Sequence, residues 1–255
     1  MKQEIKITVP KEWSAITLKQ YLNLQRDLKV YGEEENAYVA CLMHHLCGFN
    51  VEYLTQLDTE TFTNIKNDLV GFMGQTDFEL QKFITINGVE YGFEPNLSKM
   101  AYGAYLDIAK YDTFTIDENW AKIMSILYRP VTSKTGTLYE IKTYDGYINE
   151  DRFLEVPMDV HYGALFFFCS FINGLAEFYP EIFDGYGGDS SQHQVNFGKK
   201  WKNYSSVVQL ANGDIRGMSE VAELPLEQCL LFLAYQSDYN QLQNMLHKEA
   251  LAKTK

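Results

Sequence analysis

The stretch that decides the fold class is residues 82–93, which read Lys-Phe-Ile-Thr-Ile-Asn-Gly-Val-Glu-Tyr-Gly-Phe. Apolar and polar residues alternate on both sides of Asn87 and Gly88, as in two strands that each bury one face. A two-residue type I′ turn needs positive φ at both central positions, and Asn-Gly is the pair that tolerates this best. The stretch therefore predicts a β-hairpin, which Pro95 ends.

The chain on both sides of this hairpin is predicted to be mainly helical. Thr17 stands three residues before Gln20, the spacing of a capping box, and apolar residues then recur at helical spacing. Short strands are predicted at 4–9 and 138–141. Further helices are predicted at 33–47, 59–73, 97–110, 117–128, 157–178, 200–211, 219–224 and 226–251. We therefore expect an α+β fold that is mainly α-helical, with a short N-terminal strand, a β-hairpin and a C-terminal helical segment.

The domain organisation is read from a single Gly/Ser-rich stretch. A chain of 255 residues is one large domain or two small ones. Residues 184–196 are typical of a linker. We predict a mainly helical domain over 1–183, with the hairpin near 82–93, this linker at 184–196, and a C-terminal helical segment over 197–255.

The charge balance disfavours nucleic acid as a partner. The chain holds 22 Lys and Arg against 34 Asp and Glu, a formal net charge of −12. A chain this acidic repels phosphate backbones, and all of the acidic excess lies before residue 196. The N-terminus has no apolar core of a secretory signal, and the most apolar stretch, 160–176, is interrupted by His161, Ser170 and Asn173. We expect a protein of the reducing cytoplasm with free thiols and no membrane partner.

Candidate chemistry along the chain is weak. Cys41, His44, His45 and Cys47 form the sharpest metal-like cluster, but no second Cys/His pair completes a tetrahedral zinc site, so we interpret them as part of an ordinary helix. The glycines at 185–188 lack the strand, helix N-terminus and lysine of a phosphate-binding loop. No nucleophile motif occurs, and Cys169 lies in an apolar run that would raise its pKa. We predict no catalytic residue, no cofactor and no bound metal.

The aromatic content is the unusual feature, at 15% of the chain. Phe166, Phe167 and Phe168 point in three directions around one helix. Two interpretations stay open: the helix is surrounded by its own domain, or a partner completes one side.

Two segments resemble a known family. The first is 123–130, Ile-Met-Ser-Ile-Leu-Tyr-Arg-Pro, followed after a variable loop by 156–168, Val-Pro-Met-Asp-Val-His-Tyr-Gly-Ala-Leu-Phe-Phe-Phe. The second is 197–204, Phe-Gly-Lys-Lys-Trp-Lys-Asn-Tyr, with 210–215 and 220–235. Their order resembles small cytoplasmic proteins of tailed bacteriophages, the tail assembly chaperones and related tail or baseplate-hub assembly factors.

This resemblance implies a non-enzymatic chaperone that binds and solubilises the tape-measure protein in the bacterial host cytoplasm while the tail assembles. The family supplies no catalytic residues to carry over. We predict client contacts at Phe167 and Phe171, four residues apart on one helix, and at Trp201 and Tyr204. The alternative for all four side chains is core packing.

Two other functional classes stay open. The chain could be a structural subunit of the virion, such as a portal, connector, tail or baseplate component. It could also be a small-molecule or metal-dependent enzyme, which zinc at Cys41 and His45 would indicate. Self-association is left open in every case.

Overall fold

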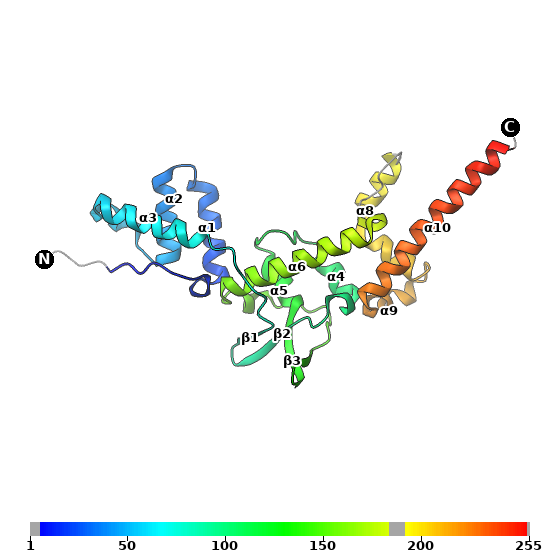
Figure 1. The fold of residues 1–255 in the computed structure, drawn as a ribbon, viewed down its shortest axis with the longest axis horizontal. Helices are drawn as coiled ribbons and strands as arrows, with labels where there is room; N and C mark the ends of the chain where they lie inside the picture. Colours follow the sequence, from blue (N-terminus) through cyan, green and yellow to red (C-terminus); the bar gives the residue numbers. More distant parts are fainter. Residues whose placement is uncertain (1–5, 184–191, 254–255) are drawn as a thin grey trace. The chain divides into compact units, whose positions relative to one another are not determined.

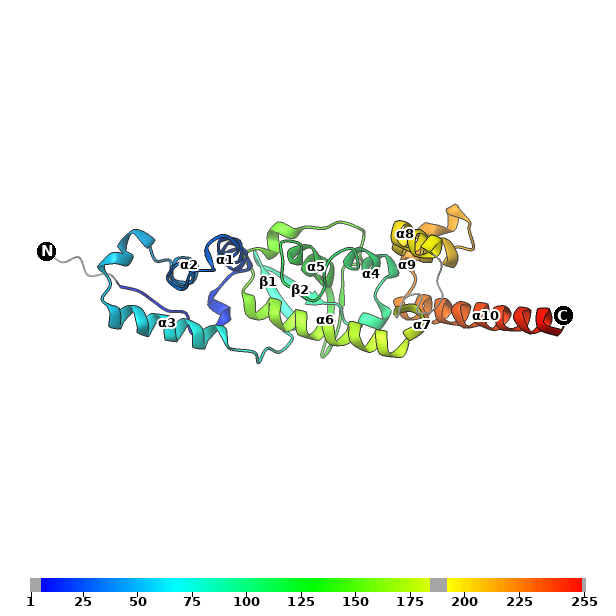
Figure 2. The ribbon, with the colours of Figure 1, turned by 90° about the horizontal axis from the view of Figure 1, so that it is seen from above.

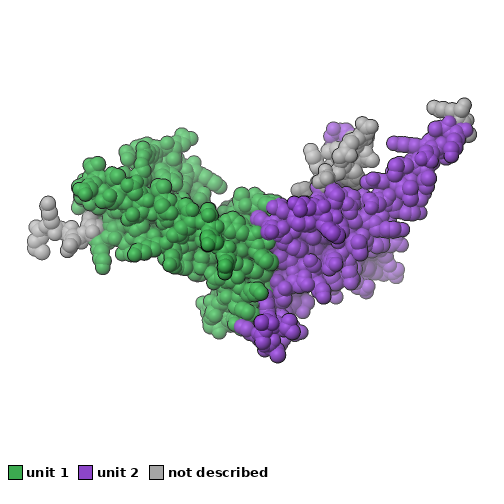
Figure 3. All heavy atoms as spheres, viewed as in Figure 1, with its two compact units in different colours: residues 1–93, 112–130, 148–167 green, residues 94–111, 131–147, 168–255 purple. Residues whose placement is uncertain are grey.

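A computed structural model describes residues 6–183 and 192–253 of the chain. The fold is α+β and mainly helical, with a small antiparallel sheet in the strand order β1-β2-β3-β4 (Figures 1 and 2). The chain divides into two compact units, each built from three separate stretches (Figure 3). Unit 1 comprises Met1–Phe93, Asp112–Pro130 and Ile148–Phe167, and unit 2 comprises Glu94–Tyr111, Val131–Tyr147 and Phe168–Lys255.

Unit 1 begins with three helices whose ends are set by local signals. Thr17 and Gln20 form a capping box at the start of the first, and the Asp58 side chain accepts a hydrogen bond from the Thr61 amide at the start of the third. Gly48, at φ 65°, ends the second in the left-handed conformation that glycine tolerates. The elements are η1 (Trp13–Ala15), α1 (Leu18–Tyr31), α2 (Glu35–Cys47), η2 (Val51–Gln56) and α3 (Thr59–Met73).

The hairpin forms the next part of unit 1. Strands β1 (Phe83–Ile86) and β2 (Val89–Phe93) pair in the register that places Ile86 opposite Val89. The turn residues Asn87 and Gly88 have φ values of 52° and 78°, as a type I′ turn requires.

Part of the core of unit 1 is formed by α5 (Trp120–Leu127) beside the hairpin. This helix is buried almost throughout, and it leads directly into β3 (Tyr128–Thr135), whose first residues pair with β2. The Tyr128 side chain is fully buried, and its hydroxyl donates a 2.6 Å hydrogen bond to the Gln81 carbonyl. A short turn of helix, η4 (Glu150–Phe153), packs on α5.

The long helix α6 (Met158–Phe178) starts in unit 1 and ends in unit 2. Its start is fixed by the Met158 amide, which donates to the Ile16 carbonyl, and by a bridge between Thr17 and Pro157. One turn on, His161 is fully buried, and its Nε2 lies 3.2 Å from the Phe153 carbonyl oxygen.

Unit 2 is organised around the start of its last helix. The Leu226 amide donates to the Met100 carbonyl, and the Tyr102 amide donates to the Leu224 carbonyl, so the two segments are held side by side. Gly103 faces Ala222 so closely that a Cβ at Gly103 would lie 3.1 Å from the Ala222 Cβ. The elements are η3 (Leu97–Lys99), α4 (Tyr102–Ile108), β4 (Leu138–Ile141), α7 (Pro180–Phe183), α8 (Gln192–Leu210), η5 (Ile215–Gly217), α9 (Met218–Glu223) and α10 (Leu226–Lys253).

The sequence predicted the fold class and most helices correctly, and four predictions need correction. No strand forms over the described residues 6–9 of the predicted strand at 4–9, because alternation alone supplies no neighbouring strand to pair with; residues 4 and 5 lie outside the described residues. The helix predicted at 97–110 is split into η3 and α4, and Tyr128 belongs to β3. Residues 184–191 of the predicted linker lie outside the described residues, whereas 192–196 are helical and begin α8.

Across 6–183 and 192–253, no helix combines the length and the apolar character that crossing a bilayer requires.

Candidate functional site

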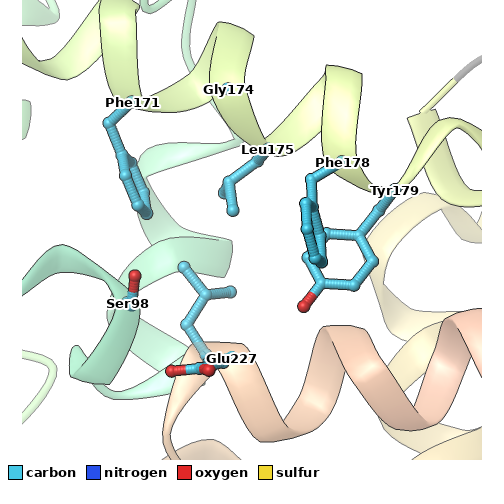
Figure 4. Close-up of a pocket in the computed structure, with 8 residues that line it drawn as sticks. Ser98, Phe171, Gly174, Leu175, Phe178, Tyr179 and Glu227 are labelled. Atoms are coloured by element: carbon cyan, nitrogen blue, oxygen red, sulfur yellow. The ribbon is translucent and has the colours of Figure 1, made fainter.

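An open apolar pocket in unit 2 is the candidate site. It lies between the end of α6 and the start of α10 and has a volume of about 330 Å³ (Figure 4). Phe171, Leu175 and Phe178 recur at four- and three-residue spacing, which puts them on one side of α6 facing α10. The full lining is Ser98, Phe171, Gly174, Leu175, Phe178, Tyr179, Leu226 and Glu227. We call these residues the unit 2 pocket.

Two residues of the pocket wall leave it open: Gly174 has no side chain, and the Phe178 ring is largely uncovered. A Cβ added at Gly174 would meet no atom within 4 Å, so the wall has room at this position. Phe178 is 74% exposed, which is costly for a large aromatic side chain in water. Leu226, by contrast, is fully buried and forms the floor on the α10 side.

Acidic groups border the pocket. Burial first, and then the carboxylates of Glu227 and Glu181, raise the pKa of Tyr179, so its hydroxyl stays protonated at neutral pH. Glu177 is exposed on α6, in the same helical turn as Phe178. A ligand that places apolar groups inside and basic groups at the edge would complement this surface.

A second aromatic surface of unit 2 lies on α8. Phe197, Trp201 and Tyr204 are exposed and follow one another along the helix, with ring centroids 6.4 Å and then 5.7 Å apart. The Lys200 ammonium lies 4.9 Å from the Trp201 ring centroid, a cation–π contact. The Tyr102 hydroxyl fixes the position of α8 by donating a 2.7 Å hydrogen bond to the Ser206 Oγ.

The four predicted contact residues are therefore distributed over three places. Trp201 and Tyr204 touch each other on α8, and Phe171 lines the unit 2 pocket. Phe167 belongs to unit 1, where it is about half exposed and packs edge-on against Phe93 with centroids 5.6 Å apart. The structure brings Trp201 and Tyr204 into contact, and it gives Phe171 and Phe167 separate surroundings.

The Phe166–Phe168 run is only partly covered. Phe168 is fully buried, whereas Phe166 and Phe167 are about half exposed, so the described chain does not surround this helix. Phe166 stacks with Phe78 and Tyr162 at centroid distances of 6.0 Å and 6.2 Å. Sequence reasoning missed Phe178, although its place seven residues after Phe171 was a usable signal.

The Cys/His cluster on α2 has other hydrogen-bonding partners. His45 Nε2 lies 2.7 Å from Asp27 Oδ2, and His44 Nδ1 lies 3.0 Å from the Phe49 carbonyl oxygen. Burial raises the pKa of the Cys47 thiol to about 11 and also raises that of Cys41. In the part of the chain that the structure describes, no three His, Cys, Asp or Glu side chains are placed to hold a metal ion.

Comparison of the chain with protein-family models, with curated proteins and with solved structures found no match.

Proposed function

We propose that this protein is a non-enzymatic assembly chaperone that covers apolar helical segments of a client, and that the client is the tape-measure protein of a tailed phage. The observation that supports this proposal is the unit 2 pocket, which presents Phe171, Leu175 and the exposed Phe178 beside open space. Exposed apolar surface of this kind marks interaction sites in soluble proteins.

The pocket favours a peptide segment as its ligand. Its volume of about 330 Å³ is at the lower end of the range of about 300–1,000 Å³ found for small-molecule sites. Its lining is mostly hydrocarbon and lies between two helices, the setting in which an amphipathic helix inserts its anchor side chains. A few apolar side chains of a client helix would fill it.

The charge of the pocket region indicates which kind of client helix it favours. Glu227 lines the pocket, Glu181 acts on the pocket residue Tyr179, and the whole chain has a net charge of −12. A client helix with lysine or arginine beside its apolar stripe is therefore favoured over an acidic one. A tape-measure chain is long and helical with apolar stripes, and such stripes aggregate when they are left uncovered.

The test fills the pocket without removing a contact. Gly174→Leu adds a side chain where a Cβ meets nothing within 4 Å, and leucine is a better helix former than glycine, so the fold should not weaken. Gly71→Leu on α3 is the matched control, because a Cβ at Gly71 also meets nothing within 4 Å. Each chain is co-expressed with tagged tape-measure fragments, and the co-purified amount is measured.

The proposal predicts that the natural chain and Gly71→Leu co-purify with a basic amphipathic fragment, while Gly174→Leu loses most of that binding. Equal recovery of all three chains, or no recovery of any, contradicts the proposal. Mass spectrometry of purified phage particles then separates a chaperone from a structural virion subunit: a chaperone is absent, whereas a subunit is present at a fixed copy number.

A further inference from the structure

The outer face of α10 carries a second apolar surface that the unit 2 pocket does not include. Phe232, Tyr235, Tyr239, Leu242 and Leu246 follow one another at alternating steps of three and four residues. They are between 44% and 61% exposed, although all five side chains are large and apolar or aromatic. We call these five residues the α10 stripe.

The C-terminal half of α10, from residue 238 onward, is not covered by other described residues of the chain. Every residue from 238 to 253 is exposed, and both ribbon views show the helix extending beyond the rest of unit 2 (Figures 1 and 2). The residues of α10 that are buried in unit 2 lie at its other end: Leu226, Cys229, Leu230, Leu233 and Ala234.

The pattern of the stripe is that of a coiled-coil seam. Steps of three and four average 3.5 residues, the repeat that keeps apolar side chains facing a partner helix. Most of the other exposed residues between 238 and 253 are polar, among them Asn240, Gln241, Asn244, His247 and Lys248, whereas Met245 and Leu251 are exposed and apolar. A helix with one apolar and one polar side normally buries the apolar side.

We propose that the α10 stripe binds the α10 stripe of a second copy of this chain, with the two helices antiparallel. The available area is sufficient. Three half-exposed aromatic rings, at roughly 150–250 Å² each, contribute about 300 Å² per helix. Leu242 and Leu246, with the neighbouring Leu231 and Met245, bring each helix to roughly 600 Å², so two copies exceed the ~1,000 Å² expected of a specific interface.

The charges along the stripe are compatible with a second copy and favour one direction of pairing. The positions that flank the stripe, at 231, 236, 238, 243 and 245, include only one charged residue, Asp238, so two identical helices do not repel each other there. Continuing the steps beyond Leu246 reaches Glu249 and Lys253. Parallel pairing would place Glu249 of one chain against Glu249 of the other, which is a like-charge contact.

Antiparallel pairing removes that contact and adds a favourable one. With Tyr239 opposite Leu242 of the second copy, Tyr235 lies opposite Leu246, Phe232 lies opposite Glu249, and Lys253 lies opposite Gln228. Because Gln228 follows Glu227, the Lys253 ammonium then comes close to an exposed carboxylate of the second copy. This self-association does not depend on the identity of any client.

The first test measures mass in solution. Sedimentation equilibrium of the 255-residue chain at micromolar concentration should show a dimer. The double variant Leu242→Lys with Leu246→Lys should weaken dimerisation by at least about a hundredfold, because each dimer loses four apolar contacts. Asn240→Lys with Asn244→Lys adds the same charge on the polar side and should leave the dimer intact.

Folding does not complicate the comparison, since all four positions are exposed, and circular dichroism and Tm should match those of the natural chain. A monomeric natural chain overturns the proposal, as does a dimer that the Leu242 and Leu246 changes leave unaltered.

The second test distinguishes antiparallel from parallel pairing of the two helices. Chains carrying Tyr239→Cys and chains carrying Leu242→Cys are mixed and mildly oxidised, and the linked peptides are mapped by mass spectrometry. A disulfide between positions 239 and 242 of different chains is the expected product, because only facing Cβ atoms come within disulfide range. A dominant link between two copies of position 242 overturns the antiparallel arrangement.

Discussion

Two glycines of α6 should respond in opposite directions to the same substitution. A Cβ at Gly163 would lie 2.2 Å from the Glu79 carbonyl oxygen and 2.9 Å from the Glu79 carbonyl carbon, whereas a Cβ at Gly174 would meet nothing within 4 Å. Carbon–oxygen contacts normally begin near ~3.3 Å, so Gly163→Ala must push the chain at 79–80 away by about 1 Å. That chain is backbone and cannot rotate aside.

The magnitude follows from two opposing effects. Replacing a helical glycine by alanine stabilises a helix by about 1 kcal/mol, and both variants gain this. Overpacking against backbone costs about 1–3 kcal/mol, and it lowers the free energy of unfolding of Gly163→Ala only. At about 2–4 °C per kcal/mol for a chain of this size, Gly163→Ala should melt about 2–12 °C below Gly174→Ala.

The assay is thermal unfolding followed by far-ultraviolet circular dichroism, with urea unfolding as a second measure of the free energy. Gly174→Ala should melt at or slightly above the natural chain. Equal melting temperatures for the two variants would refute the close approach of α6 to residues 79–80.

Three further predictions concern other parts of the fold. Burial lowers the pKa of His161 to about 3, below its usual 6.5, so between pH 3 and pH 6.5 only the unfolded chain takes up the proton. The free energy of unfolding should therefore fall by up to about 1.4 kcal/mol per pH unit below pH 6.5. His161→Gln should reduce this slope, measured by urea titrations at several pH values. A slope that His161→Gln leaves unchanged contradicts the burial of the imidazole. Gly88→Ala should destabilise the hairpin by about 1–2 kcal/mol, because Gly88 has φ 78°, and an unchanged urea midpoint would exclude the type I′ turn. Thr17→Ala removes one half of the capping box and should cost about 1 kcal/mol, whereas Thr17→Ser, which keeps the hydroxyl, should cost less.

Local signals in the sequence predicted local structure well. Asn87 and Gly88 predicted the hairpin turn because only a few residues tolerate positive φ. The Thr17 capping box and the Gly48 stop predicted helix ends, because both are made within a few residues of chain. These features depend on chemistry that is present before the chain packs.

Features that depend on distant partners could not be predicted in the same way. Pro130 correctly indicates the end of the preceding helix, which stops at Leu127. Nothing near residue 130 indicates strand β3, in which Pro130 pairs with Tyr91 of β2. The alternation at 4–9 predicted a strand, but no neighbour pairs with the described residues 6–9. A strand requires a partner that the local sequence does not name.

The candidate site was predicted only in part, for the same reason. Aromatic content pointed to α6 and α8, and Phe171 does line the unit 2 pocket. Spacing alone could not separate Phe168, which is buried, from Phe167, which is half exposed, because both sit in one apolar run. Leu226 and Ser98 reach the pocket from elements far from α6 in the sequence, so only the fold brings them together.

Solubility of the client tests the central claim most directly. The full tape-measure protein is expressed alone and together with this protein, and the fraction that remains in the supernatant after high-speed centrifugation is measured. We expect the tape-measure protein to aggregate alone and to become soluble with the natural chain, but not with Gly174→Leu. A tape-measure protein that is soluble by itself, or that stays aggregated with the natural chain present, would contradict the proposed chaperone function.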